Sequence, residues 1–235
     1  MTHRFFVETP IASDQAILTG SEAHHVLHVM RLNVGDEVTL FDGGGKQFSA
    51  RIDRLSRQQV ELAVLERQEI DVELRGELTV GVALPKADRQ RWLVEKLTEI
   101  GASRLVPLRT RRSVVHPDEK SLGKLRRAVI EASKQCGRNR LMQLQPLIGF
   151  EDFLISAPEQ ADRWLADPHG TSAATPDATI RPIYLAVGPE GGFTEEEVMD
   201  ARGRGWQTVS LGARILRIET ACLVLASIAA QRLFK

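Results

Sequence analysis

The sequence predicts an α/β protein: a small β-barrel followed by a larger domain in which strands alternate with helices. In the first seventy residues, short segments alternate apolar and polar side chains, the period of a half-buried strand. From about Leu74, buried strand-like runs alternate with helical patterns, which is typical of a parallel sheet. The acidic segment Glu61–Glu77 lies between the strand-rich part and the part in which strands and helices alternate. We therefore expect domains at residues 1–72 and 73–235.

The expected strands of the first part are "EVTLFD", "KQFSARIDRL" and "QQVELAVLER". Along the second of these, Phe48, Ala50 and Ile52 alternate with polar residues, which predicts one buried face. A short helix capped by Ser21 is expected to interrupt the strands. A small barrel is the natural closure for strands of this length.

The second part begins with the strand "ELTVGVAL" and a helix in which we expect Trp92, Leu93, Lys96, Leu97 and Ile100 to lie on one side. Next come the strand "RLVPLR" and a long helix over residues 117–136. The strand "PIYLAVG", a helix from Thr194, the strand "WQTVSLG" and a C-terminal helix complete the pattern, with "HGTSAATPDAT" expected to be a loop. Parallel sheets of this kind bind ligands at the carboxyl ends of their strands.

Composition limits the class of protein. The chain has 235 residues, 43% hydrophobic, so it has ample material for a core. Two cysteines without metal-site spacing favour a reducing, cytoplasmic setting, and none of the six histidines predicts a metal site. The first residues show no secretory signal, and the apolar run "ACLVLASIAA" is too short to span a bilayer.

The formal net charge is zero, but the charge is unevenly spread. Between Arg104 and Arg140, eleven Lys and Arg residues stand against three acidic ones, a local net charge of +8. This segment is either the solvated face of a helix or a surface that contacts RNA phosphates.

The segment "GPEGGFTEEE" joins a predicted strand to a predicted helix. Thr194 and Glu197 form a capping box, so the helix begins there and the glycines lie in the preceding loop. The loop lacks the pattern of a phosphate-binding loop, and Glu190 would repel a phosphate. The loop is therefore either a structural glycine turn or the site of an uncharged or cationic ligand held by the backbone.

A second loop, "SLGARILRIETA", follows another strand and leads into the C-terminal helix. Ile215 and Leu216 are unusual in a loop, because loops are generally solvated. These side chains either pack under the helix or form an apolar wall for a flat ligand. Two strand ends that each deliver such a loop predict a binding crevice.

Together, "GPEGGFTEEE" and "LGARILRIETA" resemble the ribosomal RNA small subunit methyltransferase E family of the SPOUT superfamily, which makes N3-methyluridine in 16S rRNA. The resemblance extends to "EAHHVLHVMRLNVGDEVTLFDGGG", "ALPKADRQRWLVEKLTEIGASRLVPLRTRRSV" and "EASKQCGR". It implies a PUA-like RNA-binding barrel, a SPOUT domain with a C-terminal trefoil knot, S-adenosylmethionine as cofactor and the 30S subunit as substrate. It also implies a homodimer formed through knot helices, so the apolar face of "TACLVLASIAAQRLF" is either core or interface.

With this family as the hypothesis, we assign residues to three roles: the cofactor residues from the resemblance, and the RNA-binding and catalytic residues from their charge and chemistry. The cofactor residues are Leu185, Gly188, Pro189, Glu190, Gly191, Gly192, Leu211, Gly212, Ile215, Leu216, Arg217, Thr220 and Ala221. The RNA-binding residues are Lys86, Arg109, Arg111, Arg112, Lys124, Arg127 and Arg138. For catalysis, Arg217 would stabilise the uridine anion and Glu190 or Glu219 would take the N3 proton, although a place at the helix start is favoured over a base for Glu219.

Two alternatives follow from the same residues. The first is the same fold methylating a ribose 2′-oxygen, a reaction that leaves N3 unmodified. The second is a non-enzymatic RNA-binding assembly factor, which would bind RNA without methyl turnover.

Overall fold

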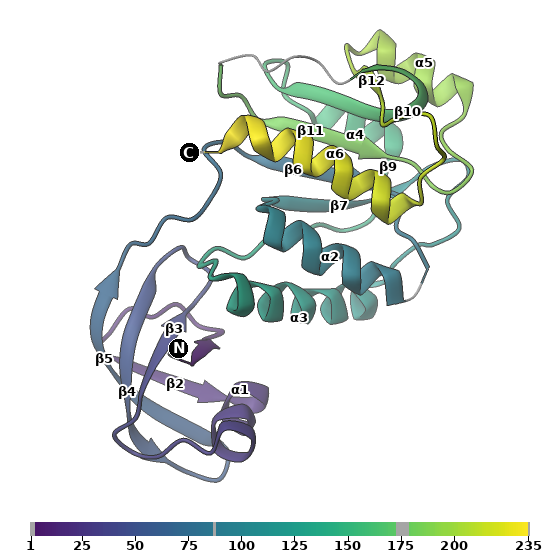
Figure 1. Cartoon of the computed structure of the whole chain (residues 1–235). Helices are drawn as coiled ribbons and strands as arrows, with labels where there is room; N and C mark the ends of the chain where they lie inside the picture. The colour runs from purple at the N-terminus through teal and green to yellow at the C-terminus, as the bar shows by residue number, and fades with distance from the viewer. Residues whose placement is uncertain (1–2, 87, 173–178, 235) are drawn as a thin grey trace. The chain divides into compact units, whose positions relative to one another are not determined.

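The computed structural model describes residues 3–86, 88–172 and 179–234. The chain divides into two compact units (Figure 1). The first contains Met1–Glu73 and Ser133–Leu141, and the second contains Leu74–Ala132 and Met142–Lys235. The α/β class predicted from the sequence is confirmed.

The first unit is a curled five-stranded sheet. Its strands are β1 (Arg4–Phe6), β2 (Gln15–Thr19), β3 (Glu37–Phe41), β4 (Gln47–Leu55) and β5 (Gln59–Gln68). They lie in the order β1-β3-β4-β5-β2, with β1 parallel to β3 and the other neighbours antiparallel. Phe48, Ala50 and Ile52 are buried, as the alternation predicted. Among the described strands β1 and β2 are the two edges, so the sheet curls around its core without pairing them.

The helical insertion of this unit differs from the prediction. Helix α1 (Gly20–His24) continues directly into a π-helical turn, His25–Met30. The N-cap is Thr19, without a side-chain capping bond, so the expected cap at Ser21 is wrong. The chain is already helical at Gly20, which places Ser21 inside the first turn.

The segment Ser133–Leu141 belongs to the first unit, although in the sequence it begins sixty positions after Glu73, where the rest of that unit ends. The ammonium of Lys134 lies 3.0 Å from a carboxylate oxygen of Glu22, and both side chains are nearly buried. Arg138 forms a two-point ion pair with Glu73. The amide of Asn139 donates to the carbonyl of Ile70. Two buried charges on this segment are therefore matched by two carboxylates of the sheet region.

The second unit contains a seven-stranded sheet whose pairs are all parallel. The strands are β6 (Leu78–Val82), β7 (Arg104–Arg109), β8 (Gln143–Leu144), β9 (Ile148–Gly149), β10 (Asp162–Ser172), β11 (Ile183–Val187) and β12 (Gln207–Ser210). Their order is β12-β10-β11-β6-β7-β8, and β9 also pairs with β7. Strands β6 and β11 are buried at every position, as expected for the centre of a parallel sheet.

Helices cover both faces of this sheet. Figure 1 shows α2 (Asp88–Ile100) and α6 (Ile218–Leu233) on one face, with α4 (Phe150–Ser156) on the other. Helix α5 (Glu195–Gly203) precedes β12. In α2 the buried residues are Leu93, Val94, Leu97 and Thr98, and Trp92 is 45% exposed. Leu93 and Leu97 of the predicted side are therefore buried, whereas Val94 and Thr98 occupy the core in place of Trp92.

Helix α3 (Glu119–Cys136) begins two residues later than predicted. The carboxylate of Asp118 accepts a hydrogen bond from the backbone N–H of Ser121 at 2.8 Å, which is the geometry of an N-cap. Hydrogen bonding by Ser121, first through its side chain and then its backbone, lowers the pKa of the Asp118 carboxyl. The aspartate thus fixes the start of the helix.

Strand β10 was not predicted. The residues expected to begin the loop "HGTSAATPDAT" form its end, because His169–Ser172 still belong to the strand. Residues 173–178 of that expected loop lie outside the described part of the chain. The polar segment Asp167–His169 interrupts the strand pattern, which explains why the sequence did not reveal it.

Among the described residues, no helix combines the length and the apolar character that crossing a membrane requires.

The two cysteines are expected to differ in reactivity. Cys222 is fully buried in α6, and burial raises the pKa of its thiol to about 12, whereas Cys136 is partly exposed. Because the thiolate is the reactive form, a disulfide reagent at pH 8 should modify one thiol in the folded protein and two after denaturation. Mass spectrometry should locate the single modification at Cys136, and early modification of Cys222 would contradict the burial.

Candidate functional site

A pocket of about 370 Å³ lies where strands β10, β11 and β12 end and the following loops begin. This volume is in the range of small-molecule sites. Four segments line it: Ala166–His169, Val187–Phe193, Leu211–Gly212 and Arg214–Leu216, together with Arg112, Val198, Val209, Ile218 and Ala221. The position agrees with the predicted crevice at the carboxyl ends of parallel strands.

The loop Gly188–Phe193 is shaped by its glycines and by the start of α5. Gly192 has φ +68, and its N–H donates to the carbonyl of Pro189 at 2.8 Å, which closes a turn. The predicted capping box is confirmed, with Thr194 and Glu197 bonded reciprocally. A Cβ on Gly188 would lie 3.1 Å from the ring of Phe193, so the backbone approaches that ring closely. The loop therefore presents bare backbone to the pocket.

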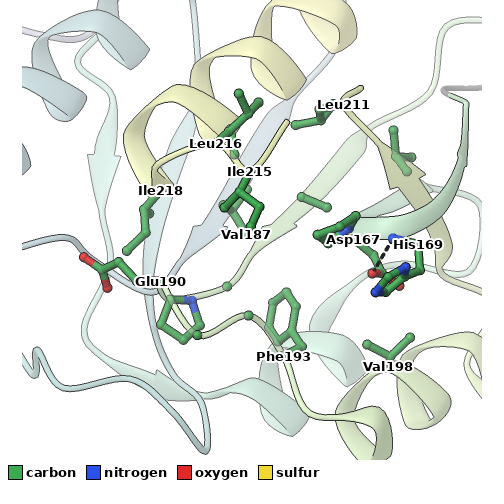
Figure 2. Close-up of a pocket in the computed structure, with 18 of the residues that line it drawn as sticks. Asp167, His169, Val187, Glu190, Phe193, Val198, Leu211, Ile215, Leu216 and Ile218 are labelled. Carbon is green, nitrogen blue, oxygen red and sulfur yellow. Dashed lines mark hydrogen bonds between the residues drawn. The ribbon is translucent and has the colours of Figure 1, made fainter. Parts of the chain in front are cut away.

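The wall opposite this loop is apolar. It includes Val187, Leu211, Leu216 and Ile218, which Figure 2 shows grouped around one side of the cavity. Ile215 also borders the pocket and is 91% exposed. The unusual Ile215–Leu216 pair therefore lies at the pocket. This agrees with the second of the two interpretations of the sequence, an apolar wall for a flat ligand.

A bulge in β10 supplies the polar end of the pocket. The pairing with β12 shifts register between Ala166 and Thr171, and the residues in between are free to turn toward the cavity. Asp167 accepts a hydrogen bond from the N–H of His169 at 3.0 Å (Figure 2). A carboxylate oxygen of Asp167 lies 3.8 Å from Arg202, and only 12% of the Asp167 side chain is exposed.

The loop after β7 is fastened to the glycine loop. Arg112 donates from Nη1 to the carbonyl of Gly191 at 2.6 Å. The buried carboxylate of Glu197 accepts from the N–H of Arg111 at 2.9 Å and from the N–H of Thr194 at 2.8 Å. The capping-box pattern in the sequence predicted the bond between Thr194 and Glu197. It could not predict the bond between Arg111 and Glu197, because these residues are 86 positions apart.

Most of the predicted cofactor residues come together. The pocket lining includes Gly188, Pro189, Glu190, Gly191, Gly192, Leu211, Gly212, Ile215, Leu216 and Ala221. It does not include Leu185, Arg217 and Thr220. Leu185 is fully buried within β11, and Thr220 is exposed on α6. The sequence missed Asp167 and His169, because the strand that carries them was not predicted.

The candidate catalytic residues lie in different surroundings. Glu190 is exposed at the pocket. Arg217 is the N-cap residue of α6, outside the pocket lining, while Arg214 borders the pocket. Glu219 is buried, lies 3.6 Å from the Arg89 guanidinium and has one carboxylate oxygen without a hydrogen bond. This placement agrees better with a structural role for Glu219 at the helix start than with a base.

The predicted RNA-binding residues also lie in different surroundings. Lys86, Arg109 and Arg111 are exposed, as are Lys124 and Arg127 on α3. Arg112 is exposed and lines the pocket.

The prediction that Arg138 binds RNA is not supported by its surroundings. It is only 4% exposed and its guanidinium is bound by Glu73, so it is not presented to a phosphate. It also follows the end of α3, so it does not lie on the same helix as Lys124 and Arg127.

No group of three or more His, Cys, Asp or Glu residues within the described ranges is arranged to hold a metal ion.

Family comparisons agree with this architecture. Residues 72–230 match the family model described as an RNA methyltransferase domain, and residues 18–65 match an RNA methyltransferase PUA domain. The ribosomal RNA small subunit methyltransferase E of Bacillus subtilis is 30% identical over 219 residues, covering 88% of this chain and 86% of the relative. The enzyme of the same name from Synechocystis is 34% identical over 210 residues, covering 87% of this chain and 69% of the relative.

Solved structures give the same result. A ribosomal RNA small subunit methyltransferase E from Neisseria gonorrhoeae, bound to S-adenosyl methionine, has a TM-score of 0.90 and 30% identity, covering 100% of this chain and 98% of that one. A putative methyltransferase from Legionella pneumophila with bound SAM has a TM-score of 0.89 and 29% identity, covering 97% and 96%.

A parallel α/β domain with a pocket at its strand ends, preceded by a PUA domain, is the architecture of an RNA methyltransferase. More particularly, the chain belongs to the ribosomal RNA small subunit methyltransferase E family.

The bulge of β10 is expected to depend on Gly170. A Cβ there would lie 2.7 Å from the backbone of Thr208 and Val209 in β12, and backbone cannot move aside as a flexible side chain can. Gly170→Ala should therefore lower the free energy of unfolding by about 1–3 kcal/mol, measured by urea denaturation. Gly203→Ala is the matched control, because a Cβ at Gly203 meets no atom within 4 Å. Equal stability of the two variants would contradict the close approach.

Proposed function

We propose that the protein transfers a methyl group from S-adenosylmethionine to N3 of one uridine in the 16S rRNA of the small ribosomal subunit. The observation that supports this most directly is the pocket at Gly188–Phe193, in a chain whose relative of known structure is bound to S-adenosyl methionine. Methylation of small-subunit rRNA is supported by the named relatives. The uridine N3 target is what the resemblance of the two loop motifs implies.

The residues of the pocket fit this cofactor. Its apolar wall suits the flat adenine ring, and the bare backbone of the glycine loop suits the polar groups of the ligand. Asp167 and Glu190 are acidic, which favours a ligand that carries a sulfonium and an ammonium. A phosphate-bearing ligand would be repelled by the same two carboxylates.

The bound cofactor would supply a methyl group on a positively charged sulfur. The residues of the chain then have two tasks: to remove the N3 proton of the uridine and to stabilise the charge spread over its two carbonyl oxygens. Glu190, exposed at the pocket, would accept the proton. An arginine would stabilise the anion, because its guanidinium is a poor base and a rigid donor.

Two arginines can be that stabiliser. The sequence favoured Arg217, which lies at the N-cap of α6. The pocket lining includes Arg214, three residues earlier. The geometry favours Arg214, and both assignments are open to a direct test.

On the RNA side, the exposed side chains of Lys86, Arg109, Arg111, Lys124 and Arg127 would contact phosphates. Such contacts provide affinity that depends on salt but no choice of sequence. The PUA-like domain, residues 1–72, would dock the structured RNA, and residues 73–235 would form the methyltransferase domain.

Three further properties belong to this proposal. The C-terminal loops would form a trefoil knot, the protein would act on the 30S subunit in the cytoplasm, and two copies would form a homodimer.

The function predicts a specific product. Purified protein and labelled S-adenosylmethionine should introduce label into 30S subunits taken from cells that lack this gene. Reverse transcription should stop at one new uridine, because N3-methyluridine cannot form a Watson–Crick pair. Label without a full stop would instead indicate ribose methylation. Tight RNA binding without label would indicate an assembly factor.

The catalytic arginine can be identified by paired variants. Arg214→Ala should lower kcat about 100-fold, the usual loss when a donor to a developing anion is removed, while the Kd for S-adenosylhomocysteine stays within about threefold of the wild-type value. Arg217→Ala, in the same assay, should lose less. A larger loss for Arg217→Ala would restore the assignment to that residue.

A further inference from the structure

We propose that Arg112 is a positioning residue that couples RNA binding to cofactor binding. This inference rests on the proposed function and adds a form of regulation to it. Arg112 was expected to contact phosphate only, but the structure gives it a second role at the pocket.

The first observation is a short hydrogen bond. The Nη1 group of Arg112 donates to the carbonyl of Gly191 at 2.6 Å. A Cβ added to Gly191 would lie 3.3 Å from the side-chain Cδ of Arg112, so the arginine stem also rests against this part of the loop. Arg112 thus supports the glycine loop from the side of the pocket.

The second observation is that Arg112 belongs to a segment that is also bonded to the first turn of α5, directly after the glycine loop. The N–H of Arg111 donates to Glu197, and the Arg111 guanidinium lies 3.3 Å from Glu196. Glu197 in turn holds the N–H of Thr194, where the glycine loop ends. The segment after β7 and the glycine loop are therefore expected to move together.

The third observation is exposure. The side chains of Arg109, Arg111 and Arg112 are all exposed. A guanidinium has five N–H donors in a rigid fork, and the bond to Gly191 uses one of them. Arg112 can therefore donate to Gly191 and to an RNA oxygen at the same time.

A simultaneous contact of Arg112 with Gly191 and with RNA would have an energetic consequence. An arginine side chain loses rotational freedom when it is fixed. That entropic cost arises only once, when either the RNA or the cofactor binds first. RNA bound to Arg112 would leave the glycine loop already ordered for the cofactor. Because coupling between two binding sites is reciprocal, the cofactor would tighten RNA binding by the same factor.

The experiment measures the Kd of radiolabelled S-adenosylhomocysteine by equilibrium dialysis, with and without 30S subunits from cells that lack this gene. In the wild-type protein, 30S subunits should lower this Kd about fivefold or more, the usual scale of such coupling. In Arg112→Ala, the Kd with 30S subunits at saturating concentration should equal the Kd without them. An arginine that only supports the fold would instead raise both values and keep their ratio.

Arg109→Ala is the matched control. Arg109 is the last residue of β7, three positions before Arg112, and is exposed. This variant should weaken binding to 30S subunits, yet at saturating 30S it should keep the wild-type ratio of the two Kd values. Arg112→Lys retains the charge but loses the fork, so it should recover only part of the ratio.

A second readout needs no ligand. Hydrogen exchange of the Gly192 amide, which bonds to Pro189, should be faster in Arg112→Ala than in Arg109→Ala. The proposal is overturned if 30S subunits leave the wild-type Kd unchanged, or if Arg112→Ala keeps the wild-type ratio. Failure of the wild-type protein to bind S-adenosylhomocysteine at all would overturn the proposed function as well.

Discussion

The buried carboxylate of Glu197 is the interaction on which the site depends. One of its oxygens accepts from the N–H of Arg111 and the other from the N–H of Thr194. Glu197 is only 9% exposed, and both of these hydrogen bonds are partly buried. A buried donor left unsatisfied costs about 1–3 kcal/mol. This one residue therefore starts helix α5, ends the glycine loop and holds the loop after β7 against both.

The pocket is built largely from backbone and apolar side chains, with few charged groups. This composition follows from its position, because strand β11 is buried along its whole length and ends directly at Gly188. A wide side chain at that point would meet the ring of Phe193, which itself stacks on Phe150 at 4.5 Å. Close packing beneath the loop thus fixes the shape of the cavity above it.

Much of the fold could be predicted from the sequence, because periodicity reports burial directly. The strands at Gln47–Leu55 and Ile183–Val187, and the start of α5 at Thr194, follow from local patterns. Strand β10 could not be predicted, because the polar residues of its bulge break the pattern at the point where it reaches the pocket. The partners of Arg112 and Arg138 could not be predicted either, since charge alone does not distinguish an exposed arginine from a paired one.

The segment Ser133–Leu141 has a consequence for the order of folding. Glu22 and Glu73 are made early in synthesis, but Lys134 and Arg138, which neutralise them, are made at least sixty residues later. Until then the N-terminal sheet carries partly buried carboxylates without their cations, which is unfavourable in a low dielectric. We therefore infer that the N-terminal unit completes its folding only after residue 141 has left the ribosome. The protein would thus depend on a later part of its own chain before its N-terminal unit is complete.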